Sequence, residues 1–483
     1  MSALHKVASG VKWTSMALVI NVIMQLTQLA LLSRLLTPYQ IGLIGIIMLV
    51  NSFSEIFLDM GISKAIIQRK NVTKRELDSL YWFNVIVGIF IFAVLFSSKS
   101  LVAYFFHSED LIYILGVSAF VFIIIPFGQQ FVALFEKSLN FKIIAIAEIL
   151  SVFVQFVFSI IFAYKGLGAI SVAYAMVIAS LIKVLTLNVF GWGVNRPSIC
   201  FSYNEIKSFL NFGVYQALDQ LVNYINGNVS SFVIGRFISI SNLGGFNIAN
   251  NFAVNIPSKI NPVITRVMFP YLSTLQNKPI ELISAFSKSL FLIGFVNIAL
   301  LSELYFNANE LVLLLFGVKW VWIVPMVKLL CFAGLFRAIC YPSGVLFMAL
   351  GRMRLGFWLN FFKTFLFILP IIFTSASIFG IYGVIYCLIV VQIVNFIVNG
   401  VVASIITSLV FLDYIKNFLM SIVYSLPLIV TLYLLDVTFE GFPLPITFSV
   451  KCAIGLIVFI GSMYFSRRIE MRDVMVSLKL RKN

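Results

Sequence analysis

About fourteen long apolar segments follow one another along the 483 residues, with only short loops between them. A membrane-spanning helix needs roughly 20 apolar residues, whereas a strand of a membrane β-barrel shows about ten with alternating hydrophobicity. Because the segments here are long and continuously apolar, the sequence predicts an all-α polytopic membrane protein with about 14 transmembrane helices, 12 being the alternative count. The expected spans are 13–36, 41–67, 80–98, 111–133, 143–163, 167–190, 211–238, 242–269, 285–306, 321–350, 356–377, 380–407, 416–435 and 446–465.

Positive charge gathers in every second loop. Of the 34 Lys and Arg residues, 23 lie in the two termini and the alternate loops between them. The intervening loops hold five: Arg34, Lys99, Lys165, Arg236 and Lys319. Lys and Arg in short loops remain on the cytoplasmic side, so both termini are expected there. The net charge of +16 is then explained by orientation and by contact with anionic lipid headgroups, and no nucleic-acid partner is expected.

An internal repeat divides the chain. A shift of 202 residues aligns Arg34 with Arg236, Asn21 with Asn223 and Lys64 with Arg266. Both copies begin on the cytoplasmic side, which indicates a parallel repeat: two six-helix bundles related by an axis along the membrane normal, with a central cleft between them. The predicted parts are 1–195 and 196–410 for the bundles, and 411–483 for a C-terminal helix pair with a basic cytoplasmic tail.

Polar side chains recur at helical spacing inside four of the spans. These spans are the first, second, seventh and eighth, the first helix pair of each half. Polar groups in a membrane are costly and face a cavity or a partner helix. A hydrated central cavity is favoured, with interhelical hydrogen bonding as the alternative for each single amide. The residues are Asn21, Gln25 and Gln28; Glu55 and Asp59; Asp219, Gln220 and Asn223; and Asn251 and Asn255.

Five cations fall within spans: Lys183, Lys259, Lys328, Arg337 and Lys363. Long cationic side chains can snorkel to the membrane interface, so the depth of Lys183 and Lys363 stays open. Those that face the cleft would outnumber the intramembrane acids and would suit an anionic substrate, since Arg binds phosphate with two parallel hydrogen bonds. Lys328 and Arg337 are nine residues apart and fall on opposite faces of a straight helix. Both reach one cavity only if the helix bends, which Gly334 could permit.

Sequence signatures of enzymes are missing. The chain has no phosphate loop, no Gly-Lys dipeptide, no D-x-D motif and no H-E-x-x-H motif. The five cysteines show no metal-binding spacing. The largest external loop, about 307–320, is short for an enzyme that polymerises glycans outside the membrane. A carrier that is not an enzyme and has no cofactor and no metal is therefore expected.

Several motifs resemble the polysaccharide transporter family. They are Ser33-Arg-Leu-Leu-Thr-Pro-Tyr-Gln-Ile-Gly42, Asp59-Met-Gly-Ile-Ser63, Ile66-Ile-Gln-Arg69, Leu80-Tyr-Trp-Phe-Asn84, Ile234-Gly-Arg236, Asn261-Pro-Val-Ile-Thr-Arg266 and Phe269-Pro270. The chain is most similar to Wzx-type exporters of O-antigen, colanic acid and teichuronic acid pathways, in the multidrug/oligosaccharidyl-lipid/polysaccharide exporter superfamily. The similarity covers most of 5–280 and fades beyond about 350. Lys64 departs from the small residue expected there.

The resemblance implies a flippase of the bacterial inner membrane, which moves undecaprenyl-diphosphate-linked oligosaccharide repeat units by alternating access for surface polysaccharide synthesis. The expected partners are this lipid-linked oligosaccharide, the bilayer and other polysaccharide assembly proteins. Spans one, two, seven and eight would line the cleft. Lys259, Arg266, Lys328 and Arg337 are then candidates for attracting the diphosphate. Glu55, Asp59 and Asp219 are candidates for binding a coupling proton or sodium ion.

Three other functions stay open. An ion-coupled drug or metabolite antiporter of the same superfamily would have a net-acidic cavity, which the excess of basic residues disfavours. A lipid II flippase is compatible with fourteen spans. A membrane glycosyltransferase or polymerase is disfavoured by the missing motifs.

Overall fold

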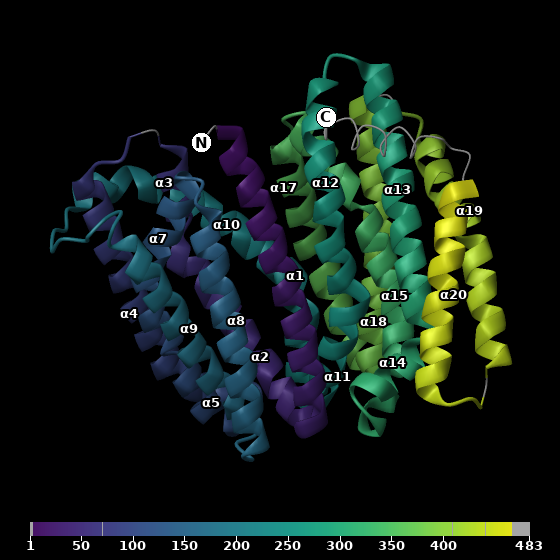
Figure 1. The fold of residues 1–483 in the computed structure, drawn as a ribbon, viewed down its shortest axis with the longest axis horizontal. Coiled ribbons are helices and arrows are strands. Elements are labelled where there is room, and N and C mark those ends of the chain that lie inside the picture. The colour runs from purple at the N-terminus through teal and green to yellow at the C-terminus, as the bar shows by residue number, and fades with distance from the viewer. Residues whose placement is uncertain (1–2, 70, 408, 440, 466–483) are drawn as a thin grey trace. The chain divides into compact units, whose positions relative to one another are not determined.

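The computed structural model describes residues 3–69, 71–407, 409–439 and 441–465, and every regular element in these ranges is a helix (Figure 1). The chain divides into two compact units, Met1–Gly245 and Phe246–Asn483. Among the described residues, ten helices are long and apolar enough to cross a membrane. They become eleven when the bent pair Asp110–Ile124 and Pro126–Lys137 is counted as one span. The all-α polytopic class is thus confirmed, with a lower count by this criterion than the predicted fourteen.

The first unit is built from ten α-helices, a π-helical turn and the start of an eleventh helix. Helix α8 packs against α1 and α9, while α9 also packs against α5 and α7. Helix α10 packs on α2, α3 and α4 of the same unit, although the predicted boundary at 195/196 separates them. The bounds are α1 Ala3–Leu35, α2 Pro38–Asp59, α3 Ile62–Gln68, α4 Lys74–Phe105, α5 Asp110–Ser118, α6 Val121–Ile124, α7 Pro126–Lys137, α8 Phe141–Tyr164, α9 Ile170–Gly191, α10 Tyr203–Val233, η1 Ile234–Ile238 and α11 Ile240–Asn250.

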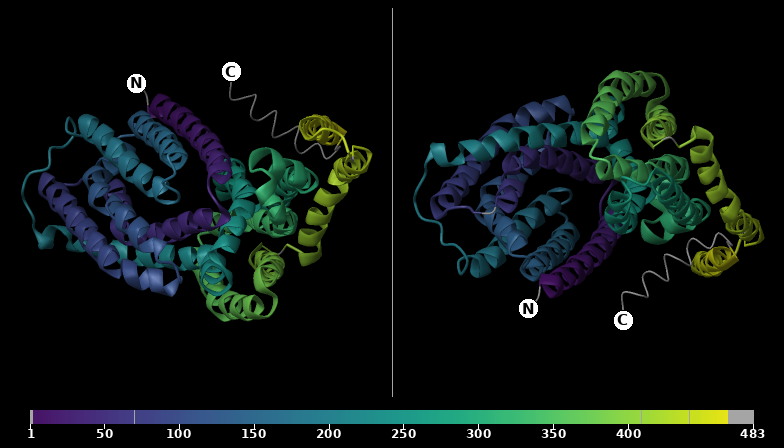
Figure 2. Two further views of the ribbon diagram at one scale, coloured as in Figure 1. Left: turned by 90° about the horizontal axis from the view of Figure 1, so that it is seen from below. Right: turned by 90° about the horizontal axis from the view of Figure 1, so that it is seen from above.

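The second unit continues from α11. Helix α13 packs against α15 and α19, and α15 also contacts α18 and the π-helical segment η2. Helices α19 and α20 lie side by side in both views of Figure 2. The bounds are η2 Asn251–Asn255, α12 Ile256–Thr274, α13 Pro279–Phe306, α14 Ala308–Leu315, η3 Val318–Ile323, α15 Val324–Ile339, α16 Tyr341–Ala349, α17 Met353–Phe362, η4 Lys363–Ile368, α18 Leu369–Thr407, α19 Phe411–Thr438 and α20 Leu444–Phe465.

Local sequence explains several helix ends. Thr37 and Gln40 form a capping box at the start of α2, with Pro38 at the first helical position. Thr73 and Glu76 form the same motif at the start of α4. In each box the Thr hydroxyl accepts the N–H of the third helical residue, whose side chain in turn accepts the N–H of Thr. Gly380 has φ 59° and ψ −141°, so the helix run labelled α18 is interrupted there.

Two glycines pack reciprocally where α2 and α11 cross in the first unit. Helix α2 begins at Pro38 and α11 at Ile240, which is the 202-residue offset of the predicted repeat. A Cβ atom on Gly42 would lie 1.9 Å from the carbonyl oxygen of Ile240. A Cβ atom on Gly244 would lie 2.3 Å from the carbonyl oxygen of Pro38. Each glycine therefore lies against the first turn of the other helix, an approach that no larger residue allows.

Candidate functional site

A polar cavity of about 490 Å³ lies inside the first unit. Its wall is formed by side chains of α2, α3, α7, α8 and α9, together with residues at the break between α6 and α7. Polar groups are costly in a spanning region unless they meet partners or water, so their convergence here indicates a hydrated or ligand-binding chamber. The polar lining residues are Glu55, Asp59, Ser63, Gln129, Ser151, Gln155, Ser180 and Lys183.

Asp59 is held by three donors at the end of α2. Its Oδ1 accepts hydrogen bonds from Ser63 Oγ at 2.5 Å, from Ser63 N at 3.3 Å and from Gln129 Nε2 at 2.9 Å. Met60 and Gly61 both have positive φ and break the helix between α2 and α3, so that the first turn of α3 lies beside Asp59. Asp59 is therefore oriented on the cavity wall by contacts from both α3 and α7.

Glu55 lies one helical turn before Asp59 and faces the same cavity. Lys183 of α9 lines the cavity as well and attracts the Glu55 carboxylate electrostatically. The spacing of four residues predicted that Glu55 and Asp59 share a face, and the structure brings them together. The sequence prediction missed Gln129 and Gln155, and it left the depth of Lys183 open. Lys183 is the single Lys or Arg in the predicted span 167–190, and this isolated charge is the sequence signal that points to it.

The predicted polar stripe of α1 divides into different environments. Gln28 is buried, and its Nε2 donates to Ser159 Oγ of α8 at 2.9 Å. Gln25 is exposed, and Asn21 is partly buried. Gln28 thus forms the kind of interhelical hydrogen bond that was the alternative to a cavity role. Among the described α10 residues, Gln220 is partly buried and Asn223 is exposed.

We expect Gln28→Leu to keep most transport activity while it destabilises the contact between α1 and α8. Interhelical hydrogen bonds in membranes contribute about 0.6 kcal/mol on average. A double-mutant cycle with Ser159→Ala, measured by thermal unfolding in detergent, should return a coupling of that order. Thr27→Ala on the same helix is the control, since Thr27 is exposed and its hydroxyl donates only within α1, to the Ile23 carbonyl oxygen. Complete loss of transport in Gln28→Leu at unchanged stability would contradict the interhelical role.

The predicted stripe at the start of the second unit lies on η2 and α12. Asn255 Nδ2 donates to Asn251 Oδ1 at 2.8 Å, so these two amides bond to each other within the π-helical segment η2. Lys259 follows on α12 and is exposed. The side chains of Asp219 and Arg266, which the sequence also singled out, lie outside the described residues.

Lys328 and Arg337 both lie on helix α15, which continues without a break through Gly334. A Cβ atom on Gly334 would lie 2.0 Å from the carbonyl oxygen of Ala253, so this glycine allows close packing on η2 instead. Lys328 Nζ lies 5.3 Å from the centroid of the Tyr305 ring. Arg337 is one of the charges near Lys363. The structure therefore places these two cations in separate surroundings.

Lys363 is surrounded by amides in the second unit. Its Nζ donates to Asn360 Oδ1 at 2.8 Å and to Asn395 Oδ1 at 3.1 Å. Asn399 Nδ2 also donates to Asn395 Oδ1, at 3.2 Å. Together with Arg337, these residues form a cationic, amide-rich group on α15, α17, η4 and α18, which suits anionic or hydroxyl-rich ligands.

Known proteins with similar folds are transporters. The inward closed conformation of the lipid II flippase MurJ matches with a TM-score of 0.75 at 15% identity, covering 97% of this chain and 100% of the other. An inward-facing multidrug resistance MATE family transporter of the MOP superfamily matches with a TM-score of 0.64 at 17% identity, covering 80% and 96%. At these identities the similarity shows the fold.

Closer sequence relatives come from polysaccharide gene regions. WzxC, the lipopolysaccharide biosynthesis protein of Escherichia coli K12, is 34% identical over 91% of this chain and 90% of its own. An uncharacterized membrane protein in the cps region of Klebsiella pneumoniae is 33% identical over 96% of both. TuaB, the teichuronic acid biosynthesis protein of Bacillus subtilis, is 30% identical over 74% of both. The profile of the family described as "Polysaccharide biosynthesis protein" matches residues 31–325. The chain therefore belongs to this polysaccharide biosynthesis family and is a Wzx-type exporter, as its sequence motifs predicted.

Proposed function

We propose that the protein moves a polyprenyl-diphosphate-linked oligosaccharide from the cytoplasmic to the outer leaflet of the bacterial inner membrane by alternating access. The chain is 34% identical to a lipopolysaccharide biosynthesis protein over 91% of its length, and its fold is like that of a lipid flippase. This combination is the observation that carries the proposal. The product would feed surface polysaccharide synthesis by other assembly proteins. A flippase redistributes its substrate between leaflets without making or breaking covalent bonds, so no catalytic residue is assigned.

The proposal includes fourteen spans in two six-helix bundles plus the pair α19–α20, with both termini in the cytoplasm. Three observations support the higher count. The 53-residue run Leu355–Thr407 is interrupted at Gly380 and can supply two spans. The bent pair Asp110–Ile124 and Pro126–Lys137 supplies another. Helix α10 and the run from α11 to α12 are long but carry the polar stripes, which lower their hydropathy. The reciprocal glycines Gly42 and Gly244 support the repeat.

The substrate's parts match different groups of side chains. Sugar hydroxyls would hydrogen-bond to Asn21, Gln25, Gln220, Asn223, Asn251 and Asn255, because amides both donate and accept. The diphosphate would be attracted by Lys259, Arg266, Lys328 and Arg337, with Lys363 as a further cation beside Arg337. The polyprenyl tail would remain in lipid, where its transfer into a polar cleft would be unfavourable.

The cavity of the first unit is proposed as the place where a coupling proton or sodium ion binds. Glu55 and Asp59 are two carboxylates on its wall, and Lys183 is the cation that attracts Glu55. In such a site either the bound cation or the lysine ammonium can balance the carboxylates. The loaded and the empty states then have similar charge, which suits reversible binding. Asp219 stays a third candidate on the basis of its sequence position.

We expect Lys183→Met to lower transport roughly tenfold, which corresponds to a coupling free energy within the usual range for linked sites. Without the lysine, the Glu55 carboxylate lacks its attracting charge and is costly to keep in the cavity. The double variant Lys183→Met with Glu55→Gln no longer has an uncompensated carboxylate at position 55. Its transport should no longer depend on the ion gradient. Lys165→Met, outside the cavity, is the control. Equal transport in all four proteins would contradict a role for this pair.

Depletion of the protein in its native cell tests the proposed substrate. Polyprenyl-linked glycans would be extracted, assigned to a leaflet and identified by mass. Accumulation of complete repeat units on the cytoplasmic leaflet, with loss of surface polymer, is expected. Normal lipid-linked pools with altered drug tolerance would instead favour the antiporter. Accumulation of lipid II would favour the alternative flippase.

A further inference from the structure

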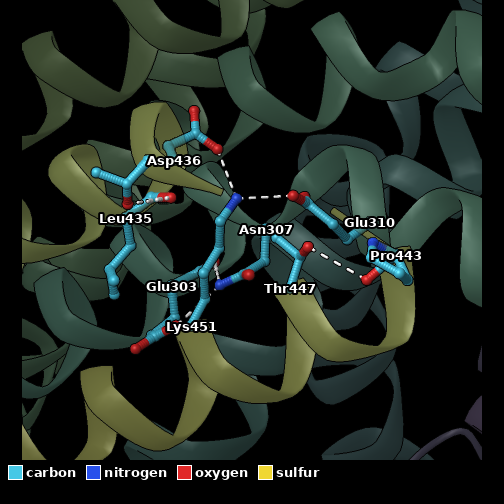
Figure 3. Close-up of polar contacts among 9 residues, drawn as sticks. Glu303, Asn307, Glu310, Leu435, Asp436, Pro443, Thr447 and Lys451 are labelled. Carbon is cyan, nitrogen blue, oxygen red and sulfur yellow. Dashed lines mark hydrogen bonds and ion pairs between the residues drawn. The ribbon is translucent and has the colours of Figure 1, made fainter. Parts of the chain in front are cut away.

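Five polar residues meet in the second unit where α13, α14, α19 and α20 come together. We call them the α20 cluster: Glu303, Asn307, Glu310, Asp436 and Lys451 (Figure 3). Lys451 of α20 is 1% exposed, and its Nζ lies 2.7 Å from Glu310 Oε1 and 2.6 Å from Asp436 Oδ1. One ammonium group thus connects α20 with both α14 and α19.

Glu303 receives its hydrogen bond from an amide and lies near the same cysteine, Cys452, as Glu310. Asn307 Nδ2 donates to Glu303 Oε2 at 3.0 Å and to the Glu303 carbonyl oxygen at 2.9 Å. Because this amide nitrogen contacts two oxygen acceptors, the orientation of the Asn307 side chain is defined by its partners. The Glu303 carboxyl group therefore receives a neutral donor, whereas Glu310 and Asp436 receive the ammonium of Lys451.

The cluster lacks hydrogen-bond donors. Three of its buried atoms have no hydrogen-bond partner: Glu303 Oε1, Asn307 Oδ1 and Glu310 Oε2. All three are acceptors when the carboxyl groups are ionised. Asn307 is 2% exposed and Glu310 is 7% exposed, whereas Glu303 is partly buried with its Oε1 atom enclosed. Buried polar atoms are nearly always satisfied, so each exception needs an explanation.

The charges of the cluster are also unbalanced. Three carboxyl groups face one ammonium group, and a charged side chain inside a membrane costs roughly 2.5–3.5 kcal/mol on insertion scales. Cys452 on α20 is a further titratable group beside Glu303, Glu310 and Lys451. Tyr305 on α13 lies close to Lys328 of α15. The remaining titratable residues of α13, α19 and α20 are Glu281, Lys288, Asp413, Tyr414, Lys416, Tyr424, Tyr433 and Tyr464. Among the described residues, no group of three His, Cys, Asp or Glu residues is placed to hold a metal ion.

Helix α20 encloses the Glu303 carboxyl group. A Cβ atom on Gly455 would lie 1.5 Å from Glu303 Oε1, so the carboxyl oxygen lies against the backbone of α20, and a larger residue at 455 would require the Glu303 side chain to move. Both α13 and α20 belong to the segments that are apolar enough to span a membrane. An ionised oxygen without a donor is strongly disfavoured in such surroundings, whereas a neutral carboxyl group is tolerated.

We propose that Glu303 holds a proton while α20 packs against α13, so that the α20 cluster is a proton-binding site of the second unit. The proton supplies a missing donor and removes one of the uncompensated negative charges. The site is separate from the cavity of Glu55 and Asp59, and it does not depend on which substrate the protein carries. Loss of the proton would leave a carboxylate whose Oε1 is enclosed against Gly455, and it would favour movement of α20 away from α13.

Infrared difference spectroscopy of the purified full chain tests this proposal. A neutral carboxyl group has a carbonyl stretch that ionised carboxylates lack and that shifts in D₂O. At neutral pH we expect Glu303→Gln to lose one such band relative to the unsubstituted protein. Glu281→Gln is the matched control on α13, since Glu281 is exposed and pairs with Lys278 at 3.1 Å. It should leave the spectrum in this region unchanged.

A second variant separates the site from general misfolding. Gly455→Ala places a methyl group where Glu303 Oε1 lies, so the band should shift in frequency or titrate at a different pH while Glu303 itself is retained. Thermal unfolding in detergent should show that Glu303→Gln, which mimics the neutral acid, is as stable as the unsubstituted protein. An unchanged neutral-carboxyl region in Glu303→Gln would overturn the proposal. The proposal would also be overturned if sodium chloride, but not choline chloride, stabilised the unsubstituted protein and failed to stabilise Glu303→Gln.

Discussion

Replacing Gly42 with alanine is expected to reduce transport by roughly tenfold or more, although Gly42 is not among the residues that line the cavity of the first unit. The new Cβ atom would lie 1.9 Å from the carbonyl oxygen of Ile240, which is backbone and cannot rotate away. Overpacking of this kind costs about 1–3 kcal/mol. Because the cost falls on the conformation in which α2 and α11 cross closely, it shifts the equilibrium away from that conformation by about 5–150-fold. Alternating access needs both states, so trapping one stops the cycle.

Gly244→Ala should have the same effect, because its Cβ atom would lie 2.3 Å from the carbonyl oxygen of Pro38. Gly227→Ala on α10 is the matched control, since no atom lies within 4 Å of its added Cβ. Surface polysaccharide in a strain lacking the native protein, compared at equal protein level in the membrane, is the measurement. Full activity of both Gly42→Ala and Gly244→Ala would show that the close crossing is not part of the transport cycle.

Replacing Lys451 with leucine is expected to destabilise the protein by about 3–5 kcal/mol, the usual cost of removing one partner of a buried ion pair. Glu310 is 7% exposed and would keep a buried carboxylate without its cation. Asp436 would be affected less, because its side chain is 40% exposed. The midpoint of thermal unfolding in detergent should fall clearly, and the loss should be concentrated in the packing of α20.

The double variant Lys451→Leu with Glu310→Gln should recover much of this stability, because no buried charge then lacks a partner. Lys416→Leu is the control in the same unit, since Lys416 is an exposed residue of α19. A drop in Lys451→Leu no larger than that in Lys416→Leu would show that the Lys451 ion pairs contribute nothing measurable. Failure of the double variant to recover would indicate that packing of the lysine stem, not charge, is responsible.

The sequence predicted the helical membrane class because continuous apolar length is a strong and local signal. It also predicted the repeat register, and the starts of α2 at Pro38 and α11 at Ile240 have that same offset. The number of spans was harder to predict. Helix α10 carries acids and amides that lower its hydropathy. The predicted spans 356–377 and 380–407 nevertheless divide the long apolar run at Gly380, where the structure interrupts it.

The candidate site was predictable where its residues are neighbours on one helix. Glu55 and Asp59 are four residues apart, and both line the same cavity. Gln129 was not identified, because it reaches Asp59 across 70 residues of sequence. Lys451 was overlooked as the one cation of the last span, and its partner Glu310 is 141 residues away. Glycine at positions 42, 334 and 455 was informative only after the opposing backbone or carboxyl group was known.

Reconstitution of the purified protein into liposomes that contain a fluorescent polyprenyl-diphosphate oligosaccharide tests the proposed function most directly. A membrane-impermeant reagent that quenches only the outer leaflet would report how much lipid is exchanged between leaflets. The account predicts quenching beyond the outer-leaflet fraction with the unsubstituted protein and with Gly227→Ala, and much slower exchange with Gly42→Ala. Quenching limited to the outer leaflet with every protein, under an imposed proton or sodium gradient as well as without one, would contradict it.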